Sequence, residues 1–270
     1  MALPHLFTAI AVVGYLLTTF LIFRDSRSQS NSIPLSLSPK LTWLSALLLH
    51  CGALAVLLFT ATGLNLNFQN AISVVVWFIA LMLFFSSWRH PLGSLALVVL
   101  PALALALTIS LTHLGSRAQI VPGNLGLQWH ILSSLLSFSI LSLGAAQALL
   151  LAYQEKRLRK HHLAGWVRRL PPMQYMEELL FQLIGVGFAL LTLSLLSGWF
   201  FLEDIFAQHL VHKTVLSIIA WIVFALLLTG RLTRGWRGQT AIRWTLWGYV
   251  LLVVAYFGSK LVLEIILHRT

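Results

Sequence analysis

Eight long apolar runs dominate this sequence, and each is long enough to cross a lipid bilayer. A helix needs about 20 apolar residues to span the hydrocarbon core. Because backbone polar groups in lipid must bond internally, such runs form helices, and they are too long and continuous for barrel strands. We therefore predict an all-α polytopic membrane helix bundle of about eight transmembrane helices. The runs cover about 6–23, 41–60, 71–87, 92–111, 128–153, 176–201, 214–229 and 241–267.

The charged residues support lipid, not nucleic acid, as the main partner. Only 9% of the residues are charged, whereas soluble domains carry about 25%. The net charge of +11 is typical of nucleic-acid binding, but the basic residues lie in short clusters between the apolar runs. We predict a multi-pass membrane protein that binds no nucleic acid.

The distribution of Lys and Arg predicts the orientation. Alternate loops hold 14 of these residues in one set and 3 in the other, and Lys260 falls within the last run. The positive-inside rule places the richer set in the cytoplasm, so we expect both termini outside. No soluble domain or internal repeat is visible, and we predict a single membrane domain over 1–270.

The histidines gather near the predicted outer surface. The chain has 10 histidines, of which His50 alone is expected at mid-membrane. Neutral imidazole is a good iron ligand, and haem iron takes one axial ligand on each face. His130 and His268 could ligate haem in this way if their helices adjoin, although zinc or no metal are also compatible with the residues alone.

Two helical faces carry further candidates. Lys260, Glu264 and His268 recur at every fourth position, so they share one face of the eighth run. A charge at the bilayer centre costs about 2.5–3.5 kcal/mol, which favours a functional role or an ion pair that fixes packing. The fifth run opens with Trp129 and His130. A stripe follows that would let a second helix or a flat ligand approach closely; it consists of His130, Ser133, Ser134, Ser137, Gly144 and Ala145.

Three short motifs then occur in order towards the C-terminus. They are Gly235-Trp236-Arg237-Gly238, Tyr256-Phe257-Gly258 and Leu267-His268. This order resembles the C-terminal core of the cytochrome c assembly membrane proteins, the CcsA/CcmC-like haem-handling family. The resemblance covers about 129–270, which we expect to form the assembly-like core. Within the family, the chain looks most like the short YpjD-type inner membrane proteins, which implies a multi-pass protein of the bacterial inner (plasma) membrane.

The resemblance implies a haem-binding membrane protein, not an enzyme, that assists cytochrome c biogenesis or haem traffic. His130 and His268 correspond to the two outer haem ligands of the family, and His50 to a histidine that contacts haem within the helices. Trp129 would form a wall of the haem cleft, and Lys260 and Glu264 belong to the expected site. His212 would serve a propionate or act as a different ligand. Other cytochrome assembly or inner membrane proteins are the expected partners, besides membrane lipid.

One element of the family is missing. A tryptophan-rich loop that presents haem should join the sixth and seventh runs, but residues 200–213 contain no such motif. The resemblance therefore implies haem binding or relay more strongly than haem presentation.

Two alternatives remain open. A secondary transporter would use Lys260, Glu264 and His50 for translocation, although the paired Gly or Pro interruptions of transporter helices are not seen. A structural partner of another membrane complex would use the basic loop around 156–169 to contact anionic lipid or protein. No phosphate loop, nucleophile elbow or zinc-protease motif suggests an enzyme.

Overall fold

The fold is a set of membrane-length helices. The computed structural model describes residues 2–28, 36–60, 63–88, 93–111, 120–121, 125–160, 170–201 and 208–258. The helices of these ranges are α1 (Ala2–Ser28), α2 (Leu37–Leu58), α3 (Phe68–Ser86), α4 (Gly93–Ser110), α5 (Leu125–Arg159), α6 (Met173–Phe201), α7 (Gln208–Arg234), α8 (Gly238–Val253) and the π-helical turn η2 (Val254–Gly258).

Seven of these helices, α1 to α7, are long and apolar enough to cross a membrane. Helix α8 has 16 described residues and continues directly into η2, while the rest of the eighth predicted run lies outside the described residues. The all-α membrane bundle is confirmed. The orientation of the termini stays a prediction, and "outer" and "inner" below refer to the sides that the charge count assigns.

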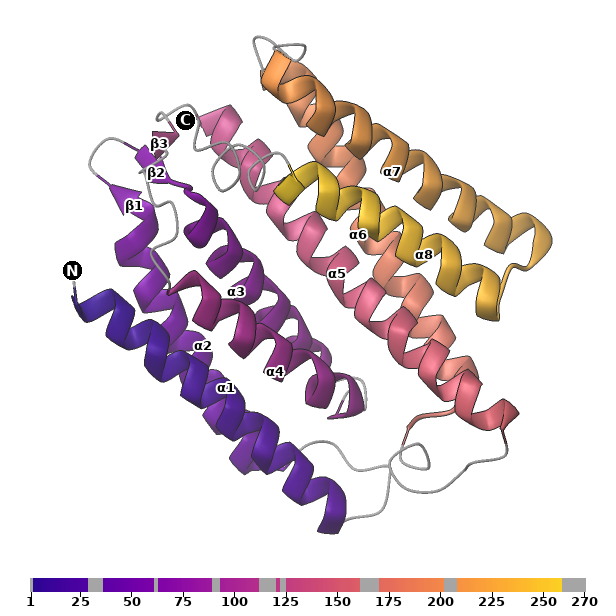
Figure 1. Cartoon of the computed structure of the whole chain (residues 1–270), viewed down its shortest axis with the longest axis horizontal. Coiled ribbons are helices and arrows are strands. Elements are labelled where there is room, and N and C mark those ends of the chain that lie inside the picture. Colours follow the sequence, from indigo (N-terminus) through magenta and orange to yellow (C-terminus); the bar gives the residue numbers. More distant parts are fainter. Residues whose placement is uncertain are drawn as a thin grey trace. The chain divides into compact units, whose positions relative to one another are not determined.

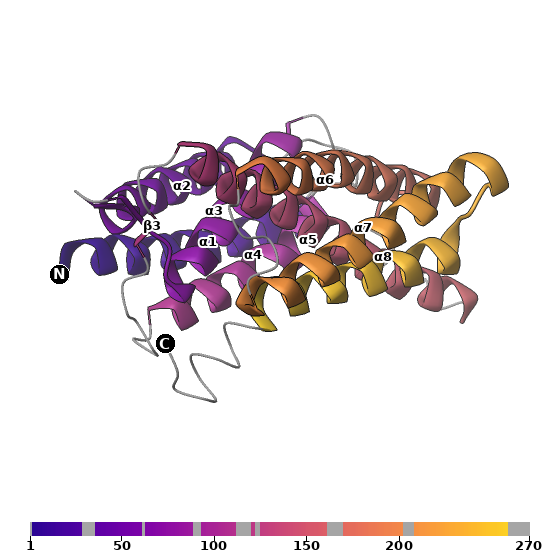
Figure 2. The ribbon, with the colours of Figure 1, turned by 90° about the horizontal axis from the view of Figure 1, so that it is seen from above.

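The helices form two compact units of four. The first unit contains α1 to α4, and the second contains α5 to α8 with η2. In each unit every helix contacts its neighbours in the sequence, and the first helix also contacts the last, which closes a ring (Figure 1). Figure 2 shows α7 and α8 running side by side within the second unit. Each ring is the up-and-down arrangement that short connections favour in helix bundles.

A small sheet that the sequence analysis did not predict lies in the first unit. Strands β1 (Phe59–Thr60), β2 (Gly63–Asn65) and β3 (Ile120–Val121) pair antiparallel in that order. Gly63 adopts a φ of 147°, which is open to glycine but not to residues with a side chain. Helix α2 therefore ends at Leu58, two residues before the predicted end of the second apolar run.

In the second unit, the Gly-Trp-Arg-Gly motif makes a tight turn between α7 and α8. Gly235 and Gly238 have φ values of 64° and 52°, in the left-handed region that favours glycine, at the two ends of the turn. Trp236 folds back on Gly230, where an added Cβ would lie 2.4 Å from the indole ring. The motif is thus explained by the backbone of this turn.

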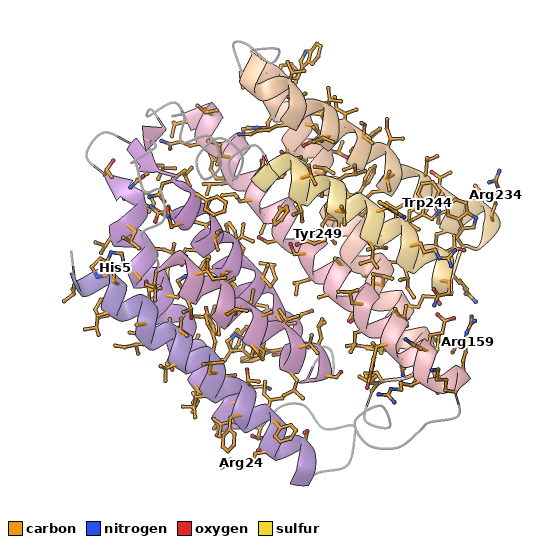
Figure 3. All side chains as sticks on the ribbon, viewed as in Figure 1. His5, Arg24, Arg159, Arg234, Trp244 and Tyr249 are labelled. Atoms are coloured by element: carbon orange, nitrogen blue, oxygen red, sulfur yellow. The ribbon has the colours of Figure 1, made fainter. Side chains whose placement is uncertain are left out.

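Two acidic side chains fix this turn to the neighbouring helices. Arg231 donates a hydrogen bond of 2.8 Å to Glu177 of α6, and Gln239 donates one of 2.7 Å to Glu155 of α5. Glu155 also pairs with Arg159. Figure 3 shows Arg159 and Arg234 at one end of this unit, as the predicted basic inner side requires.

A close approach between α1 and α2 in the first unit predicts a measurable packing effect. A Cβ at Gly14 of α1 would lie 2.7 Å from the Ala46 Cβ of α2, whereas a Cβ at Gly52 would meet nothing within 4 Å. We expect Gly14→Leu to destabilise the protein by about 1–3 kcal/mol through overpacking and to lower its thermal unfolding midpoint in detergent. Gly52→Leu is the matched control, and equal midpoints for the two variants would contradict this packing.

Candidate functional site

The predicted stripe of small residues on α5 is the contact seam with α6. Ser137 donates a hydrogen bond of 2.9 Å to the carbonyl of Gly187, and the hydroxyls of Ser134 and Ser194 lie 2.5 Å apart. Ser134 and Ser137 are both buried. Of the two occupants that the sequence allowed for this face, a second helix and a flat ligand, the structure shows the helix.

His130 lies at the outer end of this seam with one ring nitrogen engaged. Its Nδ1 atom is 3.0 Å from the carbonyl oxygen of Ser194 and 3.0 Å from the Ser197 hydroxyl. A carbonyl can only accept, so Nδ1 carries the proton and donates it. In the neutral ring Nε2 then holds the free lone pair, and both hydrogen bonds of the ring among the described residues involve Nδ1.

A glycine of α6 makes room for the His130 ring. A Cβ added at Gly198 would lie 2.9 Å from Cε1 and 3.6 Å from Nε2 of His130. The ring therefore packs directly on the α6 backbone. This contact and the hydrogen bonds of Nδ1 fix the orientation of the imidazole.

Large aromatic side chains are exposed beside this histidine in the sequence and at the facing end of α6. Trp129 and Trp199 are each 69% exposed, and Phe200 is 76% exposed. Exposed tryptophans suit the membrane interface, where one side of the ring is apolar and the other wet. They also provide flat apolar surface near the half-buried ring of His130.

His50 lies in a different place and has no free ring nitrogen. It is fully buried in the first unit, where its Nδ1 is 3.1 Å from the Tyr15 hydroxyl and its Nε2 is 2.9 Å from the Ser73 hydroxyl. These partners come from α1 and α3, so the imidazole joins three helices. Its predicted contact with haem stays a prediction.

Of the remaining predicted site residues, three lie outside the described residues and one, His212, is placed within a helix. Lys260, Glu264 and His268 lie outside the described residues. His212 belongs to α7, which begins at Gln208 and so takes up part of the predicted 200–213 loop as helix. In the part of the chain that the structure describes, no group of three or more His, Cys, Asp or Glu side chains could hold a metal ion.

The comparison with protein families decides what kind of protein this is. The family model described as "Cytochrome C assembly protein" matches residues 37–267. The chain belongs to this family. Membership supports a role in cytochrome c biogenesis, and the predicted resemblance is confirmed.

Individual relatives agree with the family assignment. Inner membrane protein YpjD of Escherichia coli (strain K12) is 34% identical over 209 residues, which are 76% of this chain and 78% of that protein. Cytochrome c biogenesis protein CcsA of Mesostigma viride is 33% identical over 87 residues, which are 32% of this chain and 28% of that protein. No solved structure matches. Together with the membrane-length helices, the relatives establish a multi-pass bacterial inner membrane protein.

Sequence analysis of the family core missed the α6 side of the site. Gly187, Leu191, Ser194 and Gly198 follow one another at spacings of 4, 3 and 4, so they form one helical face. Matching this face to the stripe on α5 would have predicted the seam. One of the two groups that engage Nδ1 is the backbone carbonyl of Ser194, and no residue type signals a carbonyl.

The buried His50 contacts predict a stability effect that depends on its partners. His50→Leu leaves the hydroxyls of Tyr15 and Ser73 without the imidazole, and we expect a loss of about 1 kcal/mol or more in unfolding free energy. Combining it with Tyr15→Phe and Ser73→Ala should recover most of that loss, because no polar group is then left unpaired. Chemical unfolding in detergent measures both effects, and a triple variant less stable than His50→Leu would refute this explanation.

Proposed function

We propose that this protein binds haem at the outer face of the membrane and assists cytochrome c biogenesis or haem traffic. His130 would supply one axial ligand through Nε2, and His268 the second. The role is one of binding and relay and is not enzymatic. Family membership supports the cytochrome c part of the proposal, and the haem part rests on the geometry around His130.

The state of the His130 ring is the observation that carries the proposal. Metal-ligating histidines almost always donate their other ring N–H to a carboxylate, a carbonyl or water, which fixes the tautomer and raises the basicity of the ligand. His130 has this arrangement with the Ser194 carbonyl at 3.0 Å. His130 therefore fits the role of one axial haem ligand, and its Nε2 atom would bind the iron.

The surroundings of His130 also suit a porphyrin. A flat apolar ring needs apolar walls, and the exposed indoles of Trp129 and Trp199 can supply them. Propionates need cations or hydrogen-bond donors at the membrane surface, for which His212 and Lys213 at the start of α7 are the candidates. Lys260 and Glu264 would complete the site from the helical face that they share with His268.

The transporter alternative gains nothing from the described residues. His50, one of its translocation residues, has both ring nitrogens hydrogen-bonded inside the first unit. Lys260 and Glu264 remain candidates for either function. We therefore retain haem binding as the proposal.

Absorption spectroscopy tests the proposal. The protein purified in detergent, with or without added haemin, should show a Soret band, because two imidazoles would hold the iron. His130→Ala and His268→Ala should each lose or shift the band. His5→Ala is the control, because this histidine belongs to the first unit and lies near its predicted outer end (Figure 3).

Two results would overturn the proposal. One is a wild-type protein with no Soret band after titration with haemin. The other is a band that survives unchanged in the His130→Ala variant. An altered band in His5→Ala alone would place the haem in the first unit instead.

A further inference from the structure

The Tyr256-Phe257-Gly258 motif has no role in the site as described so far, yet it lies against the seam that holds His130. Tyr256 belongs to the π-helical turn η2. Its ring centroid is 5.0 Å from that of Phe138 on α5. Its hydroxyl forms side-chain hydrogen bonds with Ser134 of α5 and Ser194 of α6. The tyrosine therefore contacts both helices of the seam.

The hydroxyls of this cluster have a defined direction. Ser134 donates its only proton to the His130 carbonyl at 2.7 Å. In the 2.5 Å contact between Ser134 and Ser194, the Ser194 hydroxyl must therefore be the donor. Both serine hydroxyls can then only accept from Tyr256, whose single phenolic proton is shared between them. The chain runs from Tyr256 through Ser194 and Ser134 to the backbone of His130.

Ser194 also contacts the imidazole of His130 through its backbone carbonyl. The Ser194 carbonyl accepts from His130 Nδ1 at 3.0 Å and from the Ser197 hydroxyl at 2.8 Å. His130 is thus held at two points, its backbone through the hydroxyl chain and its ring through the carbonyl. Both points depend on the position of Ser194.

We propose that Tyr256 is a positioning residue for His130, acting through the Ser194 and Ser134 hydroxyls to hold the imidazole in the orientation in which Nδ1 donates to the Ser194 carbonyl. This inference rests on the proposed haem function, although the positioning itself is a property of the protein without haem. It gives the Tyr-Phe-Gly motif a role that depends on the phenolic hydroxyl and not on the ring alone.

Tyr249 offers a matched comparison in α8, the helix that continues directly into η2. It lies seven residues before Tyr256, and its ring centroid is 5.6 Å from the Phe138 ring. Its hydroxyl, however, bonds to Ser142, which donates to the Phe138 carbonyl within α5. Tyr249 therefore shares the packing of Tyr256, but none of the contacts described for its hydroxyl leads to His130.

Removing the two hydroxyls separately tests the inference. Tyr256→Phe keeps the ring and breaks the chain, so we expect haem affinity to fall about 10-fold or more, the usual cost of losing a partner behind a metal ligand. Tyr249→Phe should leave the affinity unchanged. Ser134→Ala should behave like Tyr256→Phe. Ser142→Ala is its control, because the Ser142 hydroxyl donates to the Phe138 carbonyl of its own helix and is the partner of Tyr249.

A second measurement does not need haem. In protein labelled with ¹⁵N-histidine, the wild type should give one set of ring signals for His130, and Tyr256→Phe should shift or multiply them while Tyr249→Phe does not. Equal affinities and unchanged ring signals in Tyr256→Phe would overturn the positioning role. A wild type that binds no haem would overturn the proposed function, and the ring signals would still decide the role of Tyr256.

Discussion

Lipid offers no hydrogen bonds, so a polar side chain buried in this protein must find its partner in another helix or in its own. This constraint explains the most specific contacts of both units. In the first unit His50 bonds to hydroxyls from two neighbouring helices. In the second unit serines and His130 join α5 to α6. Because each contact needs one particular alignment of two helices, the polar groups fix registers that apolar packing alone would leave free.

The two histidines in these contacts differ in how many of their ring nitrogens are hydrogen-bonded. His50 has both nitrogens bonded and is fully buried, which suits a structural role in the first unit. His130 is half-buried, and its described hydrogen bonds engage Nδ1 alone. A ligand needs a ring nitrogen with a free lone pair, and of these two histidines His130 keeps one among the described contacts. The contrast argues that hydrogen bonding, and not the mere presence of a histidine, distinguishes a ligand from a packed residue.

Much of the fold follows from the sequence, and the site follows less completely. Run length and the need to satisfy backbone groups in lipid predicted the helices, and the small residues after His130 predicted a close approach. The division into two four-helix units and the strand pairing of Phe59–Thr60 depend on contacts between distant segments, which no local pattern encodes. The role of the Ser194 carbonyl could not be predicted from the sequence either, because every residue has a backbone carbonyl. The three C-terminal motifs predicted the link to cytochrome c assembly, and the family match confirmed it.

The central claim is that the Ser194 carbonyl holds the proton on Nδ1 of His130 and so leaves Nε2 for iron. An anomalous-difference map at the iron absorption edge, from crystals of the haem-loaded protein, tests this most directly. The account predicts an iron peak bonded to His130 Nε2, with Nδ1 still donating to the Ser194 carbonyl. An iron peak away from this ring, or an iron bonded to Nδ1, would contradict it.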